Sequence, residues 1–221
     1  MGGLIPLGDA SRKPRNFPAV TTGIIVANAF VFVLELIGGQ PFIMKWAEVP
    51  ATIVSGHRWI TILTSMFMHA GWMHIIGNMV FLWAFGPEIE DAMGPARYLV
   101  FYLLSGLAAS LGQIALMPHS AVPNLGASGA IAGVMGAFLI TYPADRIRIL
   151  LVIFWWIRIT FIPAALLIGL WFLLQLFDQV GALASGAGGA GGGVAYAAHV
   201  AGFIFGAATG RLFEGSQRVE D

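Results

Sequence analysis

Residues 62–85 read ILTSMFMHAGWMHIIGNMVFLWAF, a run of 24 residues without an aspartate, glutamate, lysine or arginine. A helix needs about 20 mostly apolar residues to cross the hydrocarbon core of a bilayer. The run is long enough to do so, yet it carries His69, His74 and Asn78. Polar groups at membrane depth cost free energy, so those that are present usually have a function. This stretch therefore predicts a membrane-spanning helix with functional polar side chains.

The composition of the whole chain agrees with a bilayer as its solvent. Of the 221 residues, 58% are hydrophobic and 10% are charged, and the mean hydropathy is +0.83. Soluble domains carry about 25% charged residues. Eleven basic and eleven acidic side chains give no net charge, so no basic surface for nucleic acid is expected, and the lack of cysteine excludes disulfides and cysteine-ligated metal or redox centres.

Apolar stretches bounded by charges, prolines or glycine clusters predict six spanning helices. They cover residues 20–37, 62–85, 98–117, 127–142, 162–177 and 193–213. We expect an all-α membrane protein, a six-helix bundle that forms one domain over residues 1–221. A short N-terminal segment, residues 1–19, and a polar tail, residues 214–221, flank the bundle.

The connection between the fourth and fifth helices is harder to assign. Residues 149–157 are apolar but too few to span a bilayer, and Arg146, Arg148 and Arg158 flank them. We expect residues 146–160 to lie at the membrane interface. Extending the fifth helix back through this stretch would place Arg158 inside hydrocarbon, at a cost of several kcal/mol.

The basic residues are distributed unevenly between the two sides of a six-span chain. One side has only Lys45 and Arg58, whereas the other side has the remaining nine. These nine are Arg12, Lys13, Arg15, Arg97, Arg146, Arg148, Arg158, Arg211 and Arg218. The positive-inside rule predicts a multi-pass protein of the plasma (inner) membrane with both termini in the cytoplasm. We expect the first helix to be retained, because its apolar run continues beyond the nominal signal-peptidase site at residues 27–29.

Residues 181–193 form a low-complexity segment in which seven of thirteen residues are glycine. It connects the fifth and sixth predicted helices on the outer side. So flexible a composition is typical of a linker or of a mobile cap over a site.

Polar side chains inside the predicted spans gather on the second, fourth and sixth helices, which all enter from the outer face. His74 and Asn78 are one turn apart and project from the same face of the second helix. His69 is turned by about 140° from His74, so we expect it to bond loop or backbone groups near the outer surface. Ser128 opens the fourth helix and His199 lies about a third of the way down the sixth, so the two reach similar depth.

Ser128 follows Pro123-Asn124-Leu125-Gly126, a loop sequence. The first amides of a helix lack intrahelical partners and carry the positive end of the helix dipole, which suits a nucleophile that generates an oxyanion. On its own, a G-x-S-G sequence is more often an N-cap serine between packing glycines. The combination with a histidine and a donor pair on other helices changes this interpretation.

Together these side chains fill three chemical roles. Ser128 could attack a carbonyl, and His199 could take and return its proton. His74 and Asn78 could join the Ser128 amide in stabilising the oxyanion. The only acidic residue inside a span is Glu35, and Asp178 lies at the outer end of the fifth helix, which favours a serine–histidine dyad over a triad.

Small residues line two of these helices and allow close helix packing. They are Gly129, Gly133 and Gly136 on the fourth helix and Gly202, Gly206 and Gly210 on the sixth. Such packing could bring Ser128 and His199 within hydrogen-bonding distance.

Three motifs, in this order along the chain, resemble the rhomboid intramembrane serine proteases. They are HAGWMHIIGN at residues 69–78, GASG at 126–129 and AHVAG at 198–202 followed by Gly206. The segment from Glu90 to Gly94 also resembles the Glu-x-x-x-Gly segment of that family.

The resemblance implies a six-helix core in which Ser128 is the nucleophile and His199 its general base and acid. It implies an oxyanion site from His74, Asn78 and the Ser128 amide, with Gly126, Gly129 and Gly202 as supporting backbone. The substrates implied are single-span membrane proteins cut in or near the spanning segment, in a site that opens to the outer side. No metal, nucleotide or other cofactor is implied, residues 181–193 would be the cap, and the fifth helix would border the lateral opening to the lipid.

The chain departs from the family pattern at two places. Many bacterial members have a tyrosine four residues after the serine, packed against the histidine, where this chain has Ala132, so His199 must be oriented differently. Arg58-Trp59 is reversed and offset from the Trp-Arg pair of the family's first outer loop, and we assign it no role.

Two other classes of function compete with proteolysis. One is a catalytically inert rhomboid-like protein that binds membrane clients, although such relatives usually lack the serine or the histidine. The other is a transporter that uses His69, His74 and His199 as a proton relay. A zinc protease would need His-Glu-x-x-His and an aspartyl protease would need paired intramembrane aspartates, and the sequence has neither.

Overall fold

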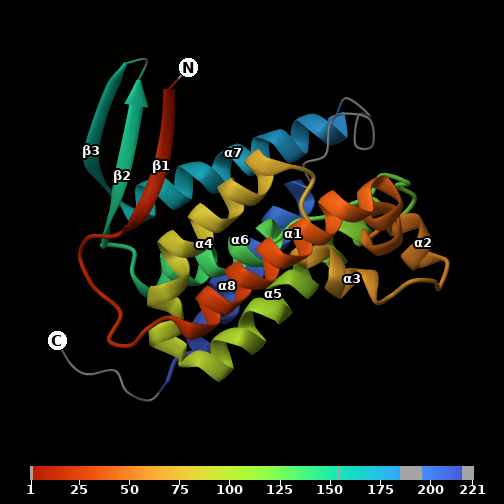
Figure 1. Cartoon of the computed structure of the whole chain (residues 1–221). Helices are drawn as coiled ribbons and strands as arrows, with labels where there is room; N and C mark the ends of the chain where they lie inside the picture. Colours follow the sequence, from red (N-terminus) through yellow and green to blue (C-terminus); the bar gives the residue numbers. More distant parts are fainter. Residues whose placement is uncertain (1, 154, 185–195, 216–221) are drawn as a thin grey trace.

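The computed structural model describes residues 2–153, 155–184 and 196–215 and is mostly helical (Figure 1). Long helices occur in each region where a spanning helix is predicted. They are α1 (Ala19–Trp46), α4 (Trp72–Met93), α5 (Pro95–Leu116), α6 (Ser128–Thr141), α7 (Ala164–Ala184) and α8 (Tyr196–Phe213). Two short helices, α2 (Pro50–Val54) and α3 (Thr61–Thr64), and a 3₁₀ turn at Ser65–Phe67 lie between α1 and α4.

Helix α1 is longer than predicted because it continues past a bend. Gly39 has a φ of 57°, outside the helical region, and Pro41 follows within the same helix. Proline lacks the N–H of the helical ladder, so the bend occurs where the sequence removes a hydrogen bond. The predicted span of residues 20–37 corresponds to the straight part before this bend.

The second predicted helix begins ten residues too early. The stretch from Ile62 is interrupted after Phe67, where Met68 is extended (φ −100°, ψ 155°), and α4 starts only at Trp72. His69 therefore lies in the connection before the helix and not inside a span. The apolar run is continuous in sequence and contains no proline, so the sequence does not indicate the break.

The prediction of an all-α protein is wrong in one respect, because the structure also contains a three-stranded antiparallel sheet. Its strands β1 (Gly2–Asp9), β2 (Arg146–Ile153) and β3 (Trp156–Pro163) pair in the order β1-β2-β3. The sheet stands at one end of the bundle beside α4 and α7 (Figure 1). The segment predicted to lie at the interface is thus a β-hairpin, and residues 1–19, predicted only as a flanking segment, supply its third strand.

Arg12 ties the N-terminal segment to the start of the hairpin. Its guanidinium donates hydrogen bonds to the Asp145 carboxylate and stacks 3.8 Å above the centroid of the Tyr142 ring. The Arg146 amide donates to the Ser11 hydroxyl at 2.8 Å. These contacts fix where β1 joins β2.

Helix α6 is the centre of the bundle, and every residue from Gly129 to Phe138 is buried. It packs against α4, α5, α7 and α8. An aromatic cluster fills the core beside it, where the rings of Phe85 and Phe138 meet edge to face at 5.2 Å. Tyr98, Phe101 and Tyr102 of α5 are fully buried next to this pair.

The outer surface of the bundle is apolar. Along α1, Val26, Phe30, Val33 and Ile37 form one stripe, and each is at least half exposed. Soluble monomers rarely expose apolar patches of this extent. Among the described residues, α1 and α5 are long and apolar enough to cross a bilayer by themselves, while α6 and residues 164–177 are shorter apolar helices.

The glycine-rich segment falls at the limit of the described chain. Residues 181–184 belong to the end of α7. Residues 185–193 lie outside the described residues.

Candidate functional site

Ser128 and His199 are in hydrogen-bonding contact although 71 residues separate them. The Ser128 Oγ lies 2.7 Å from Nε2 of His199. Ser128 is the first residue of α6, and His199 lies in the first turn of α8. The pair therefore meets at the ends of two neighbouring helices, where the first amides of α6 are free of intrahelical bonds.

Gly126 holds the loop before Ser128 close to His74. Its amide donates to the Ser65 carbonyl at 2.9 Å, and its φ is +138°, a conformation that side chains other than glycine rarely adopt. A Cβ at this position would lie 2.9 Å from both Cε1 and Nε2 of His74 and 3.5 Å from the Ser128 hydroxyl. Only glycine lets the imidazole of α4 approach the serine this closely.

Asn78 lies one turn after His74 on α4 and is buried, with 9% of its surface exposed. Its Nδ2 has no hydrogen-bond partner among the described residues. A buried amide N–H without a partner costs free energy, so such a donor usually has a ligand or a functional role. Asn78 therefore offers a donor without a partner among the described residues, on the same helix face as His74.

Glycines bring α6 and α8 together just beyond the serine–histidine pair. A Cβ on Gly202 would collide with the carbonyl group of Gly129, and a Cβ on Gly206 would collide with that of Gly133. The two helices thus touch backbone to backbone. This close approach sets the distance between Ser128 and His199.

The rhomboid domain family model matches residues 56–215, more than half of the chain and including all of these residues. The protein belongs to the rhomboid family. The match covers α4 to α8 and the whole serine–histidine site, so the resemblance seen in the sequence motifs is confirmed at the level of the family.

Individual relatives align with parts of this rhomboid domain. The rhomboid protease GluP of Bacillus subtilis is 30% identical over 118 residues, which are 52% of this chain and 23% of that protein. The putative rhomboid protease YdcA of Bacillus subtilis is 35% identical over 86 residues, 39% of this chain and 43% of that protein. The mitochondrial presenilin-associated rhomboid-like protein of Homo sapiens is 32% identical over 135 residues, 58% and 34% of the two chains. The chain matches less than half the length of each of these relatives.

The second nitrogen of His199 contacts a residue that the sequence reasoning missed. Nδ1 lies 2.5 Å from Oε1 of Gln175, and the Trp171 ring lies 5.9 Å from the imidazole, both on α7. Ala132, where many bacterial rhomboids have tyrosine, is fully buried in the core. The sequence did contain a sign of the Gln175 contact, because Gln175 is the one polar residue in the apolar stretch 164–177 and lies one turn after Trp171.

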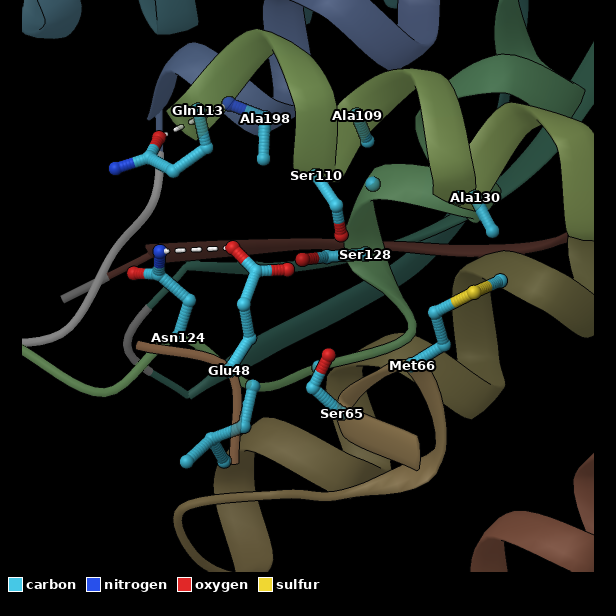
Figure 2. A pocket seen from close by; sticks show the side chains of 14 residues that line it. Glu48, Ser65, Met66, Ala109, Ser110, Gln113, Asn124, Ser128, Ala130 and Ala198 are labelled. Atoms are coloured by element: carbon cyan, nitrogen blue, oxygen red, sulfur yellow. Dashed lines mark hydrogen bonds between the residues drawn. The ribbon is translucent and has the colours of Figure 1, made fainter. Parts of the chain in front are cut away.

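A cavity of about 40 Å³ borders Ser128 and is lined by both polar and apolar residues. Figure 2 shows the oxygens of Glu48, Ser110 and Ser128 pointing into the same space. Burial raises the pKa of the Glu48 carboxyl, which hydrogen-bonds to Ser110 and Asn124. The sequence reasoning missed this cavity, because Glu48 lies outside the predicted spans and reaches the site only through a backbone pairing with Asn124.

Glu35, the acidic residue of the first predicted span, contacts the loop before α4 and not His199. The Glu35 carboxylate accepts hydrogen bonds from the His69 backbone amide at 3.0 and 3.1 Å and so anchors the loop before α4. The His69 ring packs edge-on against His74, with 5.1 Å between centroids. Glu35 is therefore a loop anchor, and the side chain of Asp178 lies outside the described residues.

Arg58 also has a structural contact. Its guanidinium donates to the carbonyl groups of Met44 and Lys45 at the end of α1. It braces the loop after α2 and does not reach Ser128.

Proposed function

We propose that this protein is an intramembrane serine endopeptidase. Ser128 attacks the scissile carbonyl, and His199 accepts the hydroxyl proton and returns it to the leaving amine. The observation that carries the proposal is the 2.7 Å contact between Ser128 Oγ and His199 Nε2 at the N-terminus of α6. Membership of the rhomboid family and relatives named as rhomboid proteases support it.

The oxyanion of the tetrahedral intermediate would be stabilised by the Ser128 amide, His74 and Asn78. The amide belongs to the first turn of α6, where the helix dipole is positive. The side-chain donors would be the His74 ring beside Gly126 and Nδ2 of Asn78, which has no hydrogen-bond partner among the described residues. Gly126, Gly129 and Gly202 serve as the backbone that permits these approaches.

Hydrolysis of the acyl-enzyme requires water, and the cavity that borders Ser128 offers a place for it. Its volume of about 40 Å³ exceeds what a water molecule needs, roughly 15 Å³. The oxygens of Glu48 and Ser110 are suitable hydrogen-bond partners for such a molecule.

The substrates in this proposal are single-span membrane proteins cut in or near the spanning segment. The exposed apolar stripe on α1 supports a position inside a bilayer. We propose six spanning helices, α1, α4, α5, α6, α7 and α8, with both termini in the cytoplasm of a plasma (inner) membrane and the site open to the outer side. The nine-to-two distribution of basic residues supports this orientation.

Cleavage of a single-span test substrate by the purified protein in liposomes tests the proposal. Ser128→Ala and His199→Ala should each abolish cleavage without lowering the temperature of unfolding by more than a few degrees. The chain provides a matched control, because Ser55 Oγ and His57 Nδ1 form a second serine–histidine pair, 3.4 Å apart and exposed. Ser55→Ala and His57→Ala should leave the rate unchanged. Full activity of Ser128→Ala would exclude the proposed nucleophile, and a wild-type protein that binds but never cuts substrates would favour the inert client-binding function.

A further inference from the structure

His199 has one hydrogen-bonding contact on each of its two ring nitrogens. Nε2 lies 2.7 Å from the Ser128 hydroxyl and Nδ1 lies 2.5 Å from Gln175 Oε1. A neutral imidazole carries one N–H and one lone pair. If Nε2 is to accept the serine proton, Nδ1 must carry the hydrogen, and a hydrogen on Nδ1 needs an acceptor. The Gln175 carbonyl oxygen is that acceptor.

Aromatic residues next to Gln175 hold α7 against α8 and so keep Gln175 beside His199. Trp171, one turn earlier on the same face, places its ring 5.9 Å from the His199 ring. Phe172 stacks on Phe203 of α8 with 4.2 Å between ring centroids. Helix α7 is thus docked on α8 by aromatic contacts at His199 and one turn after it, at Phe203.

A glutamine at position 175 costs free energy unless its side-chain amide forms a hydrogen bond. The described stretch Ala164–Phe177 is otherwise apolar. An amide in an apolar helix loses free energy unless it forms a hydrogen bond, so its presence points to a function. The partner on Nδ1 of His199 is the use that the structure provides.

We propose that Gln175 is the positioning residue of the serine–histidine dyad, an inference that rests on the proposed function. It holds His199 in the tautomer whose Nε2 lone pair faces Ser128. It continues to accept from Nδ1 when the imidazole is protonated during attack, so it stabilises the imidazolium with a dipole and not with a charge. It thus takes the position of the carboxylate in a serine–histidine–aspartate triad.

Because Gln175 lies on α7, the ability of His199 to act as a base depends on the position of that helix. Gln175 and Trp171 both come from α7, whereas His199 comes from α8 and Ser128 from α6. Moving α7 away from α8 removes the acceptor and frees the imidazole to rotate. The dyad is therefore complete only while α7 is docked.

The kinetic experiment compares two substitutions at residue 175 with a control on the same helix. Gln175→Leu removes the acceptor at similar volume and should lower kcat by about 10- to 100-fold, with KM within about twofold of wild type. Gln175→Glu keeps an acceptor and should retain activity. Its charge stabilises the imidazolium, so the acidic limb of the pH profile should move to higher pH. Among the described residues, His74 of α4 also interacts electrostatically with His199. His74 is unchanged in all of these variants, so it does not contribute to a difference between their pH profiles. Leu174→Ala, which alters an exposed neighbour, should behave as wild type.

A second readout is independent of turnover. Nitrogen NMR of histidine-labelled protein in lipid nanodiscs should show His199 protonated at Nδ1 and bare at Nε2 in the wild type, with the preference lost in Gln175→Leu. If the wild type shows this tautomer but cuts no substrate, the proposed function is wrong and the positioning role stands. If the wild type cuts and Gln175→Leu cuts at the same rate, the positioning role is wrong. A slow Gln175→Leu with no change of tautomer, or a Gln175→Glu with an unshifted pH profile, would show that residue 175 only fills space.

Discussion

The backbone of Gly202 lies directly against the carbonyl group of Gly129, three residues after His199 and one residue after Ser128. This contact between α8 and α6 leaves no room for a side chain. The geometry of the serine–histidine pair is therefore set by small residues that take no part in the chemistry. Geometry at a reacting centre matters steeply, because a misplacement of about 1 Å can cost about 100-fold in rate.

Gly202→Ala should separate α8 from α6 and uncouple His199 from Ser128. The added methyl group would overlap the Gly129 carbonyl, so we expect a loss of about 1–3 kcal/mol in stability and at least a tenfold loss of kcat/KM. Gly23→Ala on α1 is the matched control, since a Cβ there meets nothing within 4 Å. Cleavage rates and thermal unfolding in detergent measure both effects. Equal behaviour of the two variants would show that the α6–α8 contact does not control the site.

Asn78→Ala should lower kcat by about 100-fold or less and leave KM nearly unchanged. Removing one oxyanion donor typically costs about 100- to 1,000-fold, and the loss should fall at or below the lower end because the Ser128 amide and His74 remain. The buried Nδ2 of Asn78 has no partner among the described residues, so its removal should not destabilise the fold. Steady-state kinetics and an unfolding curve of the same preparation separate the two effects. An unchanged kcat would remove Asn78 from the oxyanion site.

Asp9 lies where β1 joins β2, and Asp9→Asn should change how the free energy of unfolding depends on pH. Burial and the neighbouring Asp145 carboxylate raise the pKa of Asp9 from 3.8 to about 6. The folded protein therefore holds this proton more tightly than the unfolded chain, and the free energy of unfolding falls as pH rises between these two values.

Asp145 acts in the opposite sense and in a more acidic range. Burial alone would raise the pKa of Asp145, but the hydrogen bond from Arg12 lowers it below 3.8, so its stabilising effect disappears only in stronger acid. We expect Asp9→Asn to unfold at a higher temperature than wild type at about pH 8, with the difference shrinking toward about pH 5. Calorimetry over this range is the measurement, and a difference that is constant with pH would contradict the assignment.

The sequence was sufficient for the long helices and for singling out Ser128 and His199, which lie in contact in the structure. Apolar length marks a helix without regard to its neighbours, and the GASG and AHVAG motifs identify their residues directly. The catalytic roles of the two residues stay a prediction.

Long-range contacts were the part that the sequence did not reveal. Strand β1 pairs with residues 138 to 151 positions away, from Asp9 opposite Ile147 to Gly2 opposite Ile153, and no local sequence pattern indicates that pairing. The alternation of arginine and isoleucine at residues 146–149 was the available sign of a strand, but it was interpreted as a short interfacial segment. Gln175 and Glu48 were missed for the same reason, since each reaches the site from an element whose position only tertiary packing determines.

The most direct test of the central claim is covalent labelling of the serine. The purified protein in detergent is treated with a fluorophosphonate, and the intact mass is measured for wild type, Ser128→Ala and Ser55→Ala. We expect one added label on wild type and on Ser55→Ala, located at residue 128 by peptide mapping, and none on Ser128→Ala. A label that persists on Ser128→Ala, or a folded wild-type protein that takes none, would contradict the claim.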